Sequence, residues 1–143
     1  MKKQALITGA TSGIGRATAL RLAAEGYDIT ATGRRAERLE TLRREIEAAG
    51  GRCTALVFDV RSEAEVRKFL SPLERVDLLI NNAGLAAGLE HIDQGDTADW
   101  DAMIDTNVKG LLYVTRVVTP KMVAAGGGHV FNIGSIADRK STR

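Results

Sequence analysis

The glycine-rich segment near the N-terminus holds the residues whose types and spacing most clearly indicate chemistry. Residues 4–15 read QALITGATSGIG. The apolar run Ala5–Ile7 predicts a buried strand, and helical periodicity begins at Gly13. A strand that leads into a glycine turn at a helix N-terminus can bind an anion, because no Cβ keeps the ligand away and unpaired N–H groups point at it. We therefore predict a pyrophosphate site, whereas the glycines alone would indicate an ordinary turn.

The elements that must position this site alternate along the chain. Each predicted strand is followed by a helical pattern, with Ser62 as the cap of a short helix and a kink expected at Pro120. Such alternation with short loops predicts a parallel sheet with helices on both faces. The fold class is α/β, a Rossmann-type, doubly wound, three-layer sheet in strand order 3-2-1-4-5, with the ligand crevice between strands one and four. The predicted strands are Gln4–Thr8, Asp28–Thr32, Cys53–Phe58, Val76–Ile80 and His129–Ile133, and the main helices are 13–25, 36–49 and 97–125.

The composition fits a single cytoplasmic domain over residues 1–143. Hydrophobic residues make up 44% of the chain, enough to fill one core. The 20 basic and 18 acidic residues leave a net charge of +2, which gives little support to nucleic acid as a partner. A single cysteine, Cys53, excludes an internal disulfide and suits a reducing compartment. Neither a signal peptide nor a membrane span is expected, because the first strand pattern directly follows Met1-Lys2-Lys3 and no apolar run is long enough. No metal site is predicted.

Five motifs in matching order and spacing resemble the short-chain dehydrogenase/reductase family. They are TGATSGIG at 8–15, Asp59-Val60, NNAG at 81–84, Asn107 with Gly110, and NIGS at 132–135. The stretches ATGRRAERLETL and DWDAMIDTNVKG further resemble NADP-dependent 3-hydroxy acid, or serine-type, dehydrogenases. The resemblance implies an oxidoreductase that transfers a hydride between NADP(H) and a small hydroxy or carbonyl substrate.

The resemblance also implies a set of cofactor contacts. The N–H of Ile14 and the nearby glycines would lie against the pyrophosphate, and the hydroxyls of Thr11 and Ser12 would reach phosphate or ribose oxygens. Asp59 would accept a hydrogen bond from the adenine amino group. For Asn81 and its neighbour the alternative is a turn that bonds its own backbone. The implied contacts are Gly9, Thr11, Ser12, Gly13, Ile14, Gly15, Asp59, Val60, Asn81, Ala83 and Gly84.

The residues after the second predicted strand select between the two nicotinamide cofactors. NAD sites of this architecture place an acidic residue there to bind the ribose 2′-hydroxyl. Here the strand is followed by Gly33-Arg34-Arg35, and guanidinium groups match the geometry of a phosphate. We therefore predict that Arg34 and Arg35 bind the 2′-phosphate of NADP(H). The alternative is a solvated pair of surface arginines.

Two residues match the catalytic set of the family. Ser135 would bind the substrate oxygen and Asn107 would hold a water in a proton relay; the alternatives are a strand-end turn and a helix bend. The family also uses a tyrosine shortly after the serine and a lysine one helical turn later. The only tyrosines are Tyr27 and Tyr113, and neither has a lysine at that spacing.

Two hypotheses therefore stand. We expect a sheet truncated after strand five, either as the N-terminal part of an NADP-dependent oxidoreductase or as a catalytically inactive NADP-binding module.

The helical segment over residues 108–123 carries more apolar surface than one contact with a sheet requires. The resemblance implies that this helix packs in a subunit interface, and strand five is expected to form an unprotected sheet edge. We therefore predict a homo-oligomer with Leu112, Val114 and Val117 among its contacts.

Overall fold

The computed structural model describes residues 1–136, so the last seven residues of the predicted domain lie outside the described range. It contains a parallel five-stranded sheet in the order β3-β2-β1-β4-β5, which confirms the predicted strand order. The strands are β1 (Gln4–Ile7), β2 (Asp28–Gly33), β3 (Cys53–Val57), β4 (Leu78–Asn81) and β5 (His129–Asn132). The helices are α1 (Gly13–Ala24), α2 (Ala36–Ala48), α3 (Glu63–Leu70), α4 (Thr97–Ile104), the π-helical turn η1 (Asp105–Gly110) and α5 (Leu111–Ala124).

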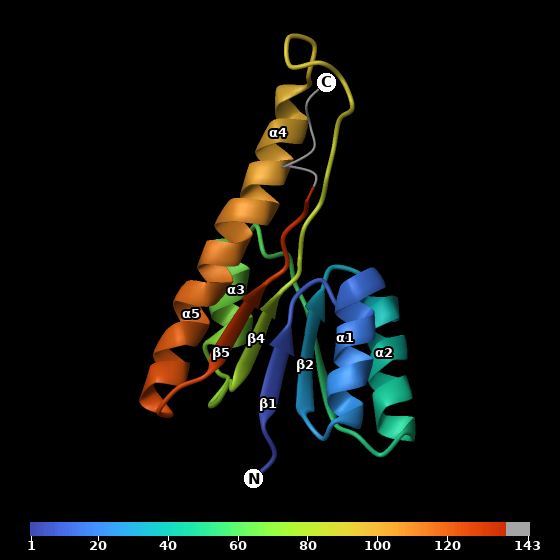
Figure 1. Cartoon of the computed structure of the whole chain (residues 1–143), viewed down its shortest axis with the longest axis vertical. Helices are drawn as coiled ribbons and strands as arrows, with labels where there is room; N and C mark the ends of the chain where they lie inside the picture. The colour runs from blue at the N-terminus through green and yellow to red at the C-terminus, as the bar shows by residue number, and fades with distance from the viewer. Residues whose placement is uncertain (137–143) are drawn as a thin grey trace.

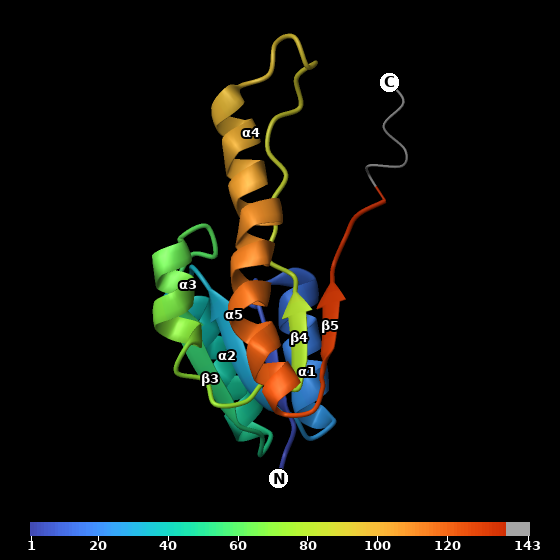
Figure 2. The same cartoon turned by 90° about the vertical axis from the view of Figure 1, so that its left-hand side faces the viewer.

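Three layers result, with α1 and α2 on one face of the sheet and α3 and α5 on the other (Figures 1 and 2). Alternate side chains of β1 supply the two cores, because successive residues of a strand point to opposite faces. Ala5 and Ile7 pack under α1 and α2, whereas Leu6 packs under α3 and α5. All three are essentially inaccessible to solvent. This burial on both faces explains the continuous apolar run in the sequence.

Local signals in the sequence account for the helix positions. Ser62 caps α3, as predicted, with its hydroxyl accepting a hydrogen bond from the Glu65 N–H. The apolar face of α2 is buried through Leu39, Leu42 and Ile46. Strand and helix ends differ from the predicted ends by one or two residues, which is the ordinary uncertainty of element boundaries.

The long helical rod made of α4, η1 and α5 departs from regular α-helix at η1, and the kink expected at Pro120 stays a prediction. Pro120 lies inside α5. At η1 the Asn107 side chain is tied to the loop after β4, since it accepts from the Leu85 N–H (2.9 Å) and donates to the Leu85 carbonyl (2.7 Å). Gly110 packs so closely on Val60 that an added Cβ would lie 2.7 Å from its Cγ2. These two attachments accompany the wider helical turn.

The apolar face of α5 also differs from the prediction. Val114 and Val118 are fully buried in the core beneath the sheet, so Val114 cannot contact another subunit. Leu112 is 57% exposed and lies on a different stripe, together with Val108 and Val123. The error arose because the apolar residues of this helix form two stripes, and the sequence alone does not say which one the sheet covers.

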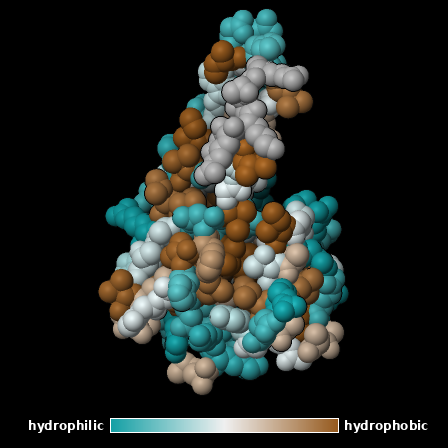
Figure 3. Space-filling view, viewed as in Figure 1, coloured by the Kyte–Doolittle hydropathy of each residue, from teal (hydrophilic) through white to brown (hydrophobic). Residues whose placement is uncertain are grey.

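An arm projects beyond the carboxyl ends of the strands, and it consists of α4 and the loop that joins β4 to α4 (Figures 1 and 2). Figure 3 shows a hydrophilic cap at the end of this arm, with apolar side chains along the rod below it. Within residues 1–136, no helix is both long and apolar enough to cross a membrane.

Candidate functional site

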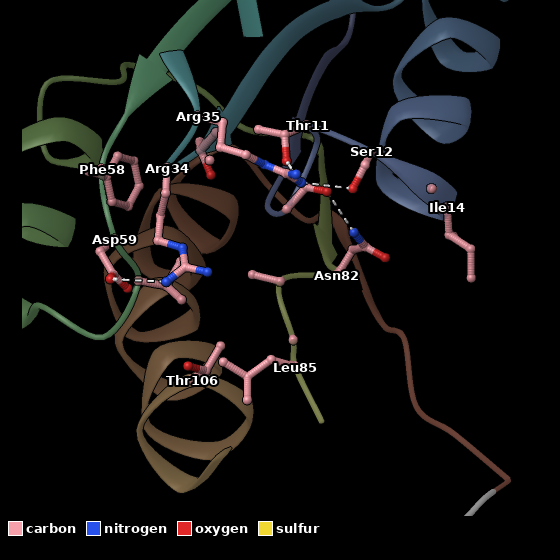
Figure 4. Close-up of a pocket in the computed structure, with 17 residues that line it drawn as sticks. Thr11, Ser12, Ile14, Arg34, Arg35, Phe58, Asp59, Asn82, Leu85 and Thr106 are labelled. Atoms are coloured by element: carbon pink, nitrogen blue, oxygen red, sulfur yellow. Dashed lines mark hydrogen bonds and ion pairs between the residues drawn. The ribbon is translucent and has the colours of Figure 1, made fainter. Parts of the chain in front are cut away.

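A pocket of about 460 Å³ lies at the carboxyl ends of the central strands, where the loops after β1, β2, β3 and β4 meet (Figure 4). This is the position of the switch point in a doubly wound sheet. Its lining includes most of the residues singled out in the sequence. These are Gly9, Thr11, Ser12, Gly13, Ile14, Arg34, Arg35, Asp59, Val60, Ala83 and Gly84.

The glycine loop lies against the loop after β4. Gly9 has a φ of +63° and Gly13 a φ of +55°, conformations that favour glycine. A Cβ on Gly9 would lie 2.8 Å from the Cα of Ala83. A side chain at Gly9 would therefore push the two loops apart. At Gly13, the first residue of α1, an added Cβ would meet open space. The first N–H groups of a helix lack partners within the helix, so this end of α1 can bind an anion.

Gly15 has a different role from the one expected, because it does not line the pocket. A Cβ at this position would collide with the carbonyl oxygen of Gly9 and the side-chain amide of Asn82. Gly15 is buried, and its lack of a side chain lets α1 pack directly on the loop that follows β1. It is therefore a packing residue in this structure.

Thr8 joins the two sides of the crevice, which the sequence reading missed. Its buried hydroxyl accepts hydrogen bonds from the N–H groups of Asn82 and Ala83, both at 3.0 Å. The Asn82 side-chain amide in turn donates to the carbonyls of Thr8 (3.1 Å) and Gly9 (3.0 Å). This reciprocal bonding fixes the mouth of the pocket before any ligand binds.

Asn81 is directed away from the pocket, contrary to the prediction. Its side chain is 4% exposed and donates to the Thr115 hydroxyl and the Asn132 side-chain oxygen, both at 3.0 Å. Since successive strand residues face opposite sides, Asn82 takes the pocket side and Asn81 the side of α5 and β5. Asn82 is the lining residue.

The two arginines after β2 have different partners (Figure 4). The Arg35 guanidinium donates to the hydroxyls of Thr11 (2.8 Å) and Ser12 (3.0 Å), so it lies across the glycine loop. Arg34 lies 4.0 Å from the Asp59 carboxylate, and its side chain remains 61% exposed. The wall between β2 and the glycine loop is therefore positively charged.

Asp59 carries the negative charge opposite. Partial burial works to raise its pKa, but hydrogen bonds and positive charge from Arg61, with a further contribution from Arg34, outweigh burial and hold the pKa below its usual value. The Arg61–Asp59 ion pair measures 2.7 Å. Asp59 is thus ionised near neutral pH and can accept a hydrogen bond. Its neighbour Val60 is buried against Gly110 and lines the same end of the pocket.

The two residues assigned to catalysis lie outside the pocket lining. Asn107 holds the arm through Leu85, which corresponds to the helix-bend alternative, and both groups of its side-chain amide are engaged there. Ser135 follows the end of β5 and is exposed. Neither tyrosine lines the pocket: Tyr27 packs on the core under α1 and α2, and Tyr113 lies between α3 and α5.

Six further pocket residues were not assigned to the site from the sequence. Phe58 stacks on Phe69 with ring centroids 5.2 Å apart, and its position beside Asp59 was the available hint. Thr106 precedes Asn107 in η1 and was hidden by the helical pattern. Among the described residues, no group of His, Cys, Asp and Glu side chains could hold a metal ion. The residues missed in the lining are Thr32, Gly33, Phe58, Asn82, Leu85 and Thr106.

Known proteins share much of this sequence. Residues 3–142 match the model of the short chain dehydrogenase family. The chain is 45% identical over 136 residues to the NADP-dependent 3-hydroxy acid dehydrogenase YdfG of Salmonella typhi, covering 92% of this chain and 54% of that protein. It is 47% identical over 137 residues to sulfoacetaldehyde reductase 2 of Chromohalobacter salexigens, again covering 92% and 54%. The chain thus spans about half the length of these curated relatives.

Solved structures agree with these matches. The closed form of serine dehydrogenase complexed with NADP⁺ superposes with a TM-score of 0.90 at 42% identity, covering 96% of this chain and 56% of that one. An NAD⁺-bound xylitol dehydrogenase superposes with a TM-score of 0.93 at 31% identity, covering 97% and 55%.

Proposed function

Because the chain belongs to the short-chain dehydrogenase family, we propose that its pocket binds NADP(H) for hydride transfer to or from a small hydroxy or carbonyl compound, such as a 3-hydroxy acid. The observation that carries the proposal is the pair Arg34 and Arg35 on the pocket wall, at a position where NAD sites use an acid. The NADP-dependent relatives support the same choice. The cofactor would supply the hydride, and the chain would bind and orient it.

The residues present fit this cofactor. The open space at Gly13 would accommodate a pyrophosphate, whose charge the start of α1 would stabilise. Arg34, with its side chain 61% exposed, is free to turn from Asp59 toward a 2′-phosphate. Arg35 already spans the glycine loop and would act as a second cation beside it. Asp59 would accept a hydrogen bond from the adenine amino group.

A second candidate is a module that binds NADP(H) without turnover. The positions of Tyr27 and Tyr113 favour it, since neither brings an acid or base to the pocket and hydride transfer to a carbonyl needs one. In that case Ser135 and Asn107 would have structural roles only, in a strand-end turn and in a helix bend. Both candidates share the cofactor, so binding and chemistry must be measured separately.

The cofactor proposal is tested by titrating the chain with NADPH and NADH. A charge-assisted contact to the 2′-phosphate is worth roughly 1.5–3 kcal/mol, which corresponds to about 10- to 150-fold tighter binding of NADPH. Arg34→Ala should remove most of this preference and leave NADH affinity little changed. Arg38→Ala, an exposed arginine of α2 outside the pocket, is the matched control. Equal affinities in the unmutated chain would reject the proposal.

We also infer self-association and a reducing, cytoplasmic compartment. Leu112, Val108 and Val123 form an exposed apolar stripe along the rod, and within residues 1–136 β5 pairs only with β4. The thiol of Cys53 is buried, and this burial raises its pKa to about 11, which suits an unreactive cysteine. Sedimentation over a concentration series tests the self-association.

A further inference from the structure

A second groove, of about 420 Å³, lies between α3 and α5 on the face of the sheet opposite α1 and α2. Its apolar surface comes from Val66, Tyr113 and Val117, and its edges from charged side chains of both helices. Val66 is fully buried and belongs to the core, so the floor of the groove is firmly held. No part of the proposed cofactor site reaches it.

The edges of this groove are strongly basic. Arg67, Arg116 and Lys121 face a single carboxylate, that of Glu63. Glu63 is shared between Arg67 at 2.8 Å and Arg116 at 3.4 Å, while the Lys121 ammonium donates to the Ser71 carbonyl at 2.8 Å. The groove thus has an excess of two positive charges around an apolar floor. Its complement is an apolar side chain flanked by carboxylates.

The end of the arm carries such a side chain. Residues 89–96 read LEHIDQGD and contain no lysine or arginine. Ile92 is 81% exposed, and two exposed carboxylates lie near it in the sequence, Glu90 two residues before it and Asp93 directly after it. We define Leu89–Asp96 as the tip. A turn closed by the Gln94 N–H on the His91 carbonyl presents Ile92 at its bend.

We propose that the tip of one copy of the chain docks in the α3–α5 groove of a second copy. Ile92 would rest on the apolar floor, with its flanking carboxylates against Arg116 and Lys121. The tip stands at the far end of the arm, whereas the groove lies beside the sheet, so a chain cannot fill its own groove (Figures 1 and 2). Since tip and groove are different surfaces, two copies can exchange both contacts around a two-fold axis.

This docking goes beyond the proposed function and does not require NADP(H). It also differs from an association through the exposed stripe of Val108, Leu112 and Val123, because opposite charges bring the surfaces together. Such contacts weaken as salt is added. The apolar stripe would give the opposite trend or none.

Charge reversal on each surface tests the docking. One variant carries Arg116→Glu and Lys121→Glu, and the other carries Glu90→Lys and Asp93→Lys. In each variant alone, tip and groove have like charges, and we expect self-association measured by sedimentation to weaken at least tenfold. Mixed in equal amounts, the two variants should associate, because each tip then meets a groove of opposite charge. A control with Arg21→Glu and Arg38→Glu on exposed helix positions should behave like the unmutated chain.

Ile92→Ser provides a second test that cannot disturb the core, since Ile92 is exposed. It should also weaken association at least tenfold. An unmutated chain that stays monomeric at 100 µM would overturn the proposal. So would reversed variants that self-associate as the unmutated chain does, or a mixture that does not associate.

Discussion

The two halves of the sheet differ in how completely they are covered. Three of the four residues of β1 and five of the six of β2 are buried between α-helical layers, while all four residues of β5 are exposed. Phe131 on β5 is 55% exposed, whereas Ile7 on β1 is inaccessible. The glycine loop and the arginines belong to the covered half. The structure therefore fixes the site that would hold the adenosine end of a cofactor more firmly than the region around Ser135.

This contrast separates binding from chemistry. In the covered half, Thr8, Asn82 and Gly15 hold the pocket in shape through packing and hydrogen bonds. In the open half, Ser135 follows β5, which lies at the edge of the described sheet, and neither tyrosine lines the pocket. The first half is expected to act as a preformed binding site, and the second to contribute little on its own.

The largest expected effect is on turnover. The chain should oxidise NADPH with small carbonyl acids no faster than background, because general acid–base catalysis is worth ~10²–10⁴-fold and neither Tyr27 nor Tyr113 lines the pocket. Binding of NADPH to the same sample, followed by fluorescence, is the control for a folded site. Sustained turnover by homogeneous chain would mean that the open half is catalytically complete.

A glycine-to-alanine change made once in each half gives the next largest expected difference in stability. Gly15→Ala forces a Cβ into the Gly9 carbonyl and should lower the free energy of unfolding by about 3 kcal/mol. It should also abolish measurable NADPH binding, because the glycine loop must shift. Gly134→Ala, where an added Cβ meets open space, should change neither quantity. Equal stability of the two variants in urea would show that the covered half is not closely packed.

Removal of one hydroxyl tests the link across the crevice. Thr8→Val leaves the N–H groups of Asn82 and Ala83 without their acceptor and should cost about 2 kcal/mol of unfolding free energy. The same change at Thr54, an exposed position on β3, should cost less than about 0.5 kcal/mol. Urea denaturation of both variants compares them. A Thr8→Val variant as stable as Thr54→Val would contradict the role given to the Thr8 hydroxyl.

The smallest expected effect concerns the amino-terminal edge of β1 and β4. Burial works to raise the pKa of Asp77, but the Arg75 hydrogen bond and the Gln4 N–H outweigh it and lower the pKa. A lowered pKa stabilises the fold above the unfolded value of about 4, and this contribution is lost as the pH falls through the folded value. Asp77→Asn should therefore reduce the acid-induced loss of stability. Acid titrations of this variant and of the unmutated chain compare them, and an identical loss of stability in both would exclude this role for Asp77.

Much of the covered half could be predicted from the sequence. The Ser62 cap follows from local turn chemistry, and the strand order follows from the alternation of strand and helix patterns, which is typical of a doubly wound sheet. Gly9 and Gly13 were predicted from their place between a strand and a helix and from the family resemblance, and their positive φ values fit such a turn.

The failures concern choices that only packing settles. Asn81 and Asn82 are equivalent in sequence, and strand alternation beside β5 decided which one faces the pocket. In the sequence Gly15 cannot be told apart from the other glycines of the loop. Only the close packing of α1 on Gly9 gives it a separate role. Val114 belongs to one of two apolar stripes, and the contact of α5 with α3 and β4 selected the buried one. The wide turn at η1 depends on Leu85, far away in sequence from Asn107.

The most direct measurement of a complete adenosine site uses a ligand that lacks the nicotinamide. Adenosine 2′,5′-bisphosphate and adenosine 5′-monophosphate differ only by the 2′-phosphate, and calorimetry can compare their affinities for the chain. If Arg34 and Arg35 form a phosphate site in the covered half, the bisphosphate should bind about 10- to 150-fold more tightly. Arg34→Ala should then bring the two affinities together. Equal binding of the two nucleotides to the unmutated chain would contradict this account.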